Sequence, residues 1–181
     1  SMTAYRLPPE SPTTPRPTGQ PYDIPWSKAD RLLPFFLTAA QEQDLPPELG
    51  IAMGLLESNW TQFNPDGSVL CVSDRWANDG PSCGVMQVKP KLWAHVLPDV
   101  NWRTEEGNIR LGMALMRRFI GEVGSWQRAI KLKYHPGTSA AGITPDDYVR
   151  SIDGLMAEFC TDTATTETPP DPVPEPVDPW R

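Results

Sequence analysis

Residues 49–56 are apolar on almost every side of the helix that they would form, and no other feature constrains the fold as strongly. The segment follows Pro46-Pro47-Glu48, a favourable helix start because proline lacks an amide hydrogen that the first turn would leave unused. Its apolar members are Leu49, Ile51, Ala52, Met53, Leu55 and Leu56. A helix that is hydrophobic all round must be buried. We therefore predict a central helix that ends at Glu57-Ser58 and is covered by other helices.

Four further segments have helical spacing and can cover the central helix. Pro34 interrupts the first of them and must either kink that helix or begin a second one. The other three begin at Thr or Ser, residues that cap helix starts well. The expected helices run from Ser27 towards Gln43, from Thr104 to Gly124, from Ser125 through Ile130, and from Thr144-Pro145 to Phe159. The fold class is therefore expected to be mainly α.

The stretch 59–90 has no helical spacing and is rich in Asn, Asp, Gly, Ser and Pro. Short β-prone pieces at 68–73 and 84–88 predict a long loop or a small β-hairpin beside a cleft. A loop of this length in a compact domain usually has a function. Cys71 and Cys83 bracket part of it, and they could form a disulfide or remain reduced thiols.

Prolines divide the chain into three parts, because most of the 22 lie near its two ends. Residues 1–25 combine Pro with Thr, Ser and Gly, a composition that buries too little apolar surface to offset chain entropy. Residues 161–181 alternate Pro with acidic residues, which favours an extended linker. We therefore expect an N-terminal arm over 1–25, one domain over 26–160, and an acidic tail over 161–181.

The net charge of −7 argues against a nucleic-acid partner, since such binding depends on Lys and Arg. No run of residues approaches the roughly 18 apolar positions that span a bilayer. The Pro-rich start shows no apolar core of a signal peptide. His95 and His135 are the two histidines of the chain and have no spaced acidic partners. We expect neither a metal nor another cofactor.

Glu57 ends a segment that is otherwise apolar, and the packing expected there gives no structural reason for a carboxylate at this position. Both the negative end of the helix dipole and the apolar surroundings should raise its pKa. A carboxyl group that keeps its proton near neutral pH can act as a general acid towards a glycosidic oxygen. The alternative is an exposed glutamate at a frayed helix end.

Five motifs in a fixed order resemble one enzyme family. They are Leu45-Pro46-Pro47-Glu48-Leu49 through Leu55-Leu56-Glu57-Ser58, then Gly84-Val85-Met86-Gln87-Val88, then Asn108-Ile109 with Gly112 and Leu115, then Tyr134-His135-Pro136-Gly137, and finally Tyr148-Val149. Over about residues 28–160 the chain resembles the SLT-type lytic transglycosylases and the goose-type lysozymes. The resemblance implies an α+β lysozyme-like catalytic domain over 26–160, with Glu57 as the catalytic acid.

The resemblance also assigns roles around Glu57. Tyr134 and Tyr148 would orient Glu57 and stabilise charge, and Met86 and Gln87 would line a glycan cleft. Either tyrosine could instead be an ordinary core aromatic, and Met86 could be a core residue.

Other residues belong to the implied substrate-binding surface by position. Ser58 follows the catalytic acid, and His135 and Pro136 replace the Asn and Ala that are usual in the family. Apolar ring faces suit sugars, so Trp60, Trp76 and Trp93 are candidates for the cleft, with a small core as their alternative role.

Two reactions are possible at such a site, and they differ in whether a second carboxylate is needed. A hydrolytic muramidase needs a base that activates water, whereas a lytic transglycosylase needs one protein carboxylate. Goose-type enzymes have an acid just after Met-Gln-Val, where this chain has Lys89. Asp74 and Asp79 could supply a base, or could simply form turns.

The sequence therefore favours non-hydrolytic cleavage of peptidoglycan between N-acetylmuramic acid and N-acetylglucosamine. The product would be 1,6-anhydromuramic acid, and Glu57 would act first as acid and then as base. A muramidase that uses Glu57 with Asp74 or Asp79 is the alternative enzyme, and a glycan-binding module without turnover is the alternative of another class. We expect a monomer that acts on glycan strands of the bacterial cell wall and is secreted, periplasmic or delivered by a phage as an endolysin.

Overall fold

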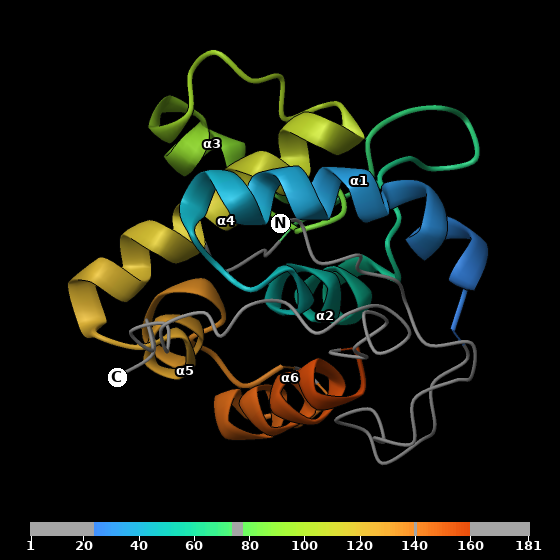
Figure 1. The fold of residues 1–181 in the computed structure, drawn as a ribbon. Coiled ribbons are helices and arrows are strands. Elements are labelled where there is room, and N and C mark those ends of the chain that lie inside the picture. Colours follow the sequence, from blue (N-terminus) through green and yellow to red (C-terminus); the bar gives the residue numbers. More distant parts are fainter. Residues whose placement is uncertain (1–23, 74–77, 140, 160–181) are drawn as a thin grey trace, which may run out of the picture.

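A computed structural model of the chain describes residues 24–73, 78–139 and 141–159. These residues contain six α-helices and one two-stranded sheet (Figure 1). The helices are α1 (Trp26–Gln43), α2 (Pro47–Ser58), α3 (Pro90–Trp93), α4 (Glu105–Val123), α5 (Trp126–Ala129) and α6 (Pro145–Phe159). The prediction of a mainly helical protein with a small hairpin is confirmed. No helix among the described residues is long and apolar enough to cross a membrane.

Helix α2 is the centre of the packing. It contacts α1, α4 and α6, and every residue from Leu49 to Leu55 is buried. Figure 1 shows α1 on one side of α2 and α6 on the other. At Gly50 and Gly54 an added Cβ would lie 3.1 Å from Phe36 of α1, so glycine permits the close approach of these helices. The predicted central helix is confirmed.

Helix α1 differs from the prediction at its start. It begins at Trp26, after Pro25, so Ser27 lies inside the helix and does not cap it. Of the two alternatives for Pro34, the second helix is excluded, because Pro34 lies inside α1. It is exposed, whereas Leu32 and Phe36 are buried. The proline ring and its missing hydrogen bond are therefore on the solvent side, where the chain tolerates them better than in the core.

The predicted starts of α4, α5 and α6 are confirmed by their caps. The hydroxyl of Thr104 accepts a hydrogen bond from the amide of Gly107, and Ser125 does the same for Arg128. Thr144 and Asp147 form a reciprocal capping box, with amide-to-side-chain distances of 3.0 and 3.1 Å. Helix α5 continues into a π-helical turn, Ile130–Tyr134, whereas the predicted helix extended only through Ile130.

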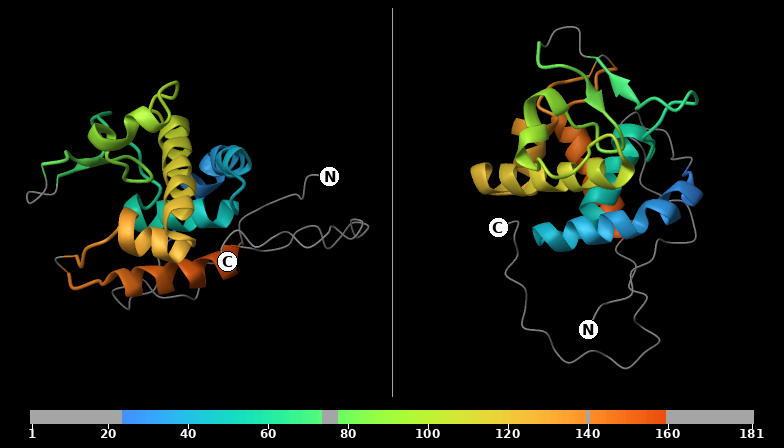
Figure 2. Two further views of the ribbon diagram at one scale, coloured as in Figure 1. Left: turned by 90° about the vertical axis from the view of Figure 1, so that its left-hand side faces the viewer. Right: turned by 90° about the horizontal axis from the view of Figure 1, so that it is seen from above.

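The hairpin pairs β1 (Cys71–Val72) with β2 (Ser82–Cys83) in antiparallel register, and Cys71 lies opposite Cys83. These two cysteines form a disulfide. The second β-prone piece, 84–88, forms a tight turn instead of a strand, because Gly84 and Gln87 have φ values of +76° and +49°. Figure 2 shows the hairpin on the side of the molecule away from α1.

Most of the predicted arm and all of the predicted tail lie outside the described residues. Ile24 is buried in the core. The folded unit therefore includes Ile24, two residues before the predicted start at 26.

The disulfide leads to a first prediction. Titration of thiols in the denatured, unreduced protein should find one free thiol among the three cysteines. The Cys71→Ser, Cys83→Ser double variant should lose about 2–3 kcal/mol of unfolding free energy in urea, because the bridge closes a short loop of the unfolded chain. A titration that finds three thiols would contradict the bridge.

Candidate functional site

Glu57 lies in the last turn of α2, which ends because Asn59 and Trp60 adopt left-handed conformations with φ values of 51° and 55°. Its side chain is 11% exposed. Burial raises the pKa of Glu57 from its ordinary value of 4.5 to about 7, and a hydrogen bond from Tyr148 opposes this rise. Glu57 is therefore a desolvated acid that is poised to exchange a proton near neutral pH, and the frayed-end alternative is wrong.

Tyr148 and His135 form one wall around the carboxyl group of Glu57. The hydroxyl of Tyr148, on α6, donates a hydrogen bond to Oε1 of Glu57. The ring of His135 stacks on that of Tyr148, with centroids 4.5 Å apart and planes 23° apart. Nδ1 of His135 lies 4.0 Å from Oε1 of Glu57, and burial lowers the pKa of His135. The structure thus brings these three residues together from α2, α6 and the segment after α5.

Tyr134 ends the π-helical turn and approaches from another side. Its hydroxyl donates a hydrogen bond to the backbone carbonyl of Met86. Burial, and secondarily the charge of Glu57, raise the pKa of Tyr134 well above its ordinary value. The neutral phenol is therefore held near Glu57 and tied to the 84–88 turn.

Two buried amides that sequence analysis did not single out for a role hold the 84–88 turn. Gln62 Oε1 accepts a hydrogen bond from the amide of Val85 at 2.9 Å, and Asn108 Oδ1 accepts one from the amide of Met86 at 2.8 Å. A Cβ at Gly84 would lie 2.3 Å from Asn108 Nδ2. Glycine is required there for both its φ and its space. Gln62 lies in the loop region, where its sequence neighbours give no sign of burial.

Ser58 and Met86 both contribute to the packing and bonding of the fold. The hydroxyl of Ser58 donates to the carbonyl oxygens of Gly54 and Val85 at 3.2 and 2.8 Å, which ties the end of α2 to the turn. The side chain of Met86 is fully buried, and it lies so close to Gly112 of α4 that a Cβ there would be 2.7 Å away. The expected place of Met86 in the lining of a cleft is therefore wrong, and core packing is what the structure shows.

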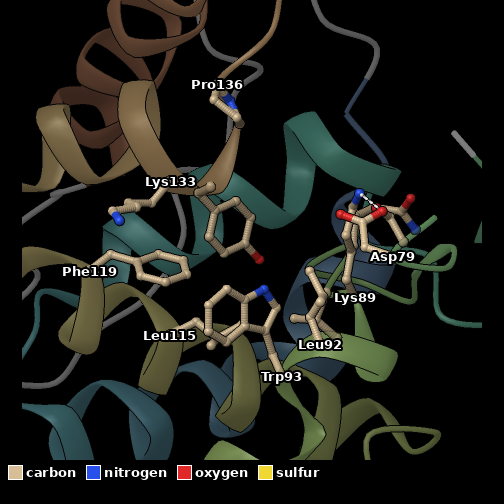
Figure 3. Close-up of a pocket in the computed structure, with 12 residues that line it drawn as sticks. Asp79, Lys89, Leu92, Trp93, Leu115, Phe119, Lys133 and Pro136 are labelled. Carbon is tan, nitrogen blue, oxygen red and sulfur yellow. Dashed lines mark hydrogen bonds and ion pairs between the residues drawn. The ribbon is translucent and has the colours of Figure 1, made fainter. Parts of the chain in front are cut away.

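Gln87 and Tyr134 both line one pocket. Figure 3 shows this pocket in close-up. Nε2 of Gln87 donates to the carbonyl oxygen of Gly84 at 3.0 Å. Trp93 and Phe119 form an aromatic wall with ring centroids 5.2 Å apart. The pocket is lined by Asp79, Ser82, Gln87, Val88, Lys89, Leu92, Trp93, Leu115, Phe119, Lys133, Tyr134 and Pro136.

Asp79 and Lys89 form an ion pair at the edge of this pocket, with Oδ1 and Nζ 2.8 Å apart (Figure 3). The hydrogen bond from Lys89 lowers the pKa of Asp79. Asp74 and Trp76, the other expected substrate-binding residues of this loop, lie outside the described residues.

The tryptophans separate into different roles. Trp60 is fully buried, and its Nε1 donates to the carbonyl oxygen of Ile51 at 2.9 Å. Trp60 is therefore a core residue, so its expected place in the cleft is wrong. Trp93 does line the pocket. Phe119, Leu115 and Lys133 also line it, and the helical spacing of α4 could not show that Phe119 and Leu115 reach a pocket.

Comparison of the chain with known protein families and with curated proteins finds no match.

Burial of Glu57 leads to a second prediction, about stability. A carboxyl group whose pKa is raised in the folded state stabilises the fold below its unfolded pKa, and this contribution disappears as the pH rises through about 7. Glu57→Gln cannot ionise, so it should gain stability relative to the wild type as the pH rises from 4.5 to 8. The gain should be at most roughly 3 kcal/mol, since one pKa unit corresponds to about 1.4 kcal/mol.

Urea unfolding of both proteins at the two pH values measures this difference. Glu106→Gln, at an exposed position of α4, is the matched control and should stay close to the wild type at both. If Glu57→Gln also follows the wild type at both pH values, Glu57 is not desolvated.

Proposed function

We propose that this protein cleaves peptidoglycan between N-acetylmuramic acid and N-acetylglucosamine as a lytic transglycosylase. The observation that carries the proposal is the state of Glu57, a buried carboxyl group at the end of α2 with a pKa of about 7. A general acid works best when its pKa lies near the working pH. A residue that must donate a proton and then take one back has the same requirement.

The proposed reaction has two steps, and Glu57 serves both. First, the carboxylic acid of Glu57 donates its proton to the glycosidic oxygen. The bond from that oxygen to C1 of the muramyl ring breaks, and the acetamido oxygen of the same sugar bonds to C1. Next, the carboxylate of Glu57 accepts the proton of the C6 hydroxyl. The C6 oxygen then bonds to C1 and displaces the acetamido oxygen, which leaves a 1,6-anhydro ring and a protonated Glu57.

The tyrosines suit this cycle. The Tyr148 hydroxyl donates to Glu57 Oε1, which stabilises the carboxylate that forms when the proton leaves. Tyr134 stays a neutral phenol close to the same group. Neither tyrosine competes with Glu57 as an acid near neutral pH, so Glu57 remains the proton donor.

The ion pair between Asp79 and Lys89 favours the lyase over the alternative muramidase. A general base must be free to accept a proton from water, and the lowered pKa of Asp79 makes it a weaker base. Lys89 also occupies the position at which the resembled goose-type enzymes have an acid. A muramidase that uses Asp74 or Asp79 is the second candidate, and the product analysis below tests it.

The pocket beside Tyr134 supports a glycan substrate. Trp93 offers a ring face for the C–H face of a sugar, and Gln87 offers an amide for its substituents. The position of Glu57 at the end of a central helix agrees with the lysozyme-like fold that the resemblance in sequence implies. We propose that this protein acts as a monomer at the bacterial cell wall, whether it is secreted, periplasmic or carried by a phage.

A glycan-binding module without turnover is the alternative of another class. It would gain little from Glu57, because burying an ionisable group costs free energy and binding does not use its proton. Clearing of purified cell walls by the wild type, absent with Glu57→Gln, supports an enzyme. If neither protein clears them, the binding module is favoured.

The reaction leads to a third prediction. Peptidoglycan digested by the protein should release muropeptides that end in 1,6-anhydro-N-acetylmuramic acid and weigh one water less than hydrolytic products. Glu57→Gln should reduce their release by several orders of magnitude, because an amide cannot donate the proton. Mass spectrometry distinguishes the products directly. Reducing-end products that disappear in Asp79→Asn or Asp74→Asn would replace the lyase with the muramidase.

The hydrogen bond from Tyr148 leads to a fourth prediction. Tyr148→Phe removes the interaction that lowers the pKa of Glu57, so that pKa should rise above about 7. The high-pH limb of kcat/KM, which requires protonated Glu57, should therefore move to higher pH. The maximal rate should fall about 10- to 100-fold, as expected for the loss of one hydrogen bond to a charged group. A limb that stays in place would show that Tyr148 does not stabilise the carboxylate.

A further inference from the structure

The contacts of His135 point to a role other than the substrate binding that its place in the sequence suggested. Its ring stacks on the Tyr148 ring, with centroids 4.5 Å apart and planes 23° apart. Its Nδ1 is 4.0 Å from Glu57 Oε1, which is too long for a hydrogen bond. The side chain of His135 is 31% exposed, so one part of the ring is covered and one part is open. The His135 ring therefore stacks on Tyr148 and makes no hydrogen bond to Glu57 through Nδ1.

The backbone explains how two consecutive residues reach opposite sides of the site. The amide of His135 donates to the carbonyl oxygen of Ile130 at 2.8 Å, a bond across five residues that closes the π-helical turn. Such turns are rare in proteins, and those that occur often lie at functional sites. From this turn Tyr134 bonds to the carbonyl of Met86, while His135 stacks on Tyr148 of α6.

We propose that His135 is a positioning residue, whose stacked ring holds Tyr148 in the orientation that donates a hydrogen bond to Glu57. A phenol ring without a neighbour can rotate about its side-chain torsions, and a hydrogen bond weakens steeply when its angle changes. The stacked His135 ring limits that rotation. The groups that face His135 are Glu57 of α2 and Tyr148 of α6, with Tyr134 beside it on its own turn. Burial lowers the pKa of His135, which favours the neutral form of the imidazole.

The inference rests on the proposed function for its kinetic consequence but not for its structural one. If His135 acts through the hydroxyl of Tyr148, its loss should matter only while that hydroxyl is present. This makes a double-mutant cycle between the two positions the decisive experiment. The cycle has four proteins: the wild type, His135→Ala, Tyr148→Phe and the double variant.

The first readout is the titration midpoint of Glu57, which is measured by carbon NMR of the protein with labelled glutamate. The Glu57→Gln variant lacks this signal and so assigns it. His135→Ala should move the midpoint upwards, in the direction expected for Tyr148→Phe, and should have no further upward effect in the Tyr148→Phe background. This readout does not depend on any activity, so it tests the positioning even if no anhydro product is found. An unchanged midpoint in His135→Ala, or an equal shift in both backgrounds, would overturn the proposal.

The second readout is kcat on purified peptidoglycan. His135→Ala should lower kcat about 3- to 10-fold with little change in KM, and the loss should disappear in the Tyr148→Phe background. His135→Phe keeps a ring that can stack, so it should lose less than His135→Ala. Leu132→Ala, at a half-exposed position of the same π-helical turn, is the control for local disturbance. A loss that is mainly in KM, or the same loss with Phe as with Ala, would instead assign His135 to substrate contact.

Discussion

The burial of α2 is the constraint on which the rest of the structure depends. Its residues from Leu49 to Leu55 are covered by α1, α4 and α6, and the glycines at 50 and 54 let α1 approach closely. Because the helix is covered on all sides, the carboxyl group at its end is also removed from solvent. The same packing that stabilises the domain therefore makes Glu57 an unusual acid. The burial of α2 is thus the common cause of the stability of the domain and of the raised pKa of Glu57.

The second constraint is the 84–88 turn, which connects the hairpin to the helices. Its amides bond to Gln62 and Asn108, its Val85 carbonyl accepts from Ser58, and its Met86 carbonyl accepts from Tyr134. The backbone of the turn thus forms hydrogen bonds with the loop, α2, α4 and the π-helical turn. This explains why a short segment without regular structure can hold side chains in fixed places.

The parts of the fold that could be predicted from sequence are those set by near neighbours. Thr104, Ser125 and the Thr144–Asp147 pair cap helices through residues three positions away, and the apolar run of α2 requires burial wherever it lies. Glu57 stood out for the same local reason. The burial of Met86 and Trp60 could not be predicted in this way, because it depends on helices distant in sequence. The choice between the two alternatives for Pro34 could not be made from sequence for a related reason, since the tolerance of α1 for a proline depends on which side of the helix faces solvent.

Two opposed effects act on Glu57, and their balance matters more than either alone. Desolvation alone would favour a carboxyl group that holds its proton too tightly to release it, and a strong hydrogen bond alone would favour a permanent carboxylate. Burial dominates, and Tyr148 moderates it, which leaves a pKa of about 7. A group that must be an acid in one step and a base in the next is most effective when both forms are accessible at the working pH. The packing of a tyrosine against a buried glutamate is sufficient to provide this without a second carboxylate, and it is the reason why the ion-paired state of Asp79 need not impair the proposed reaction.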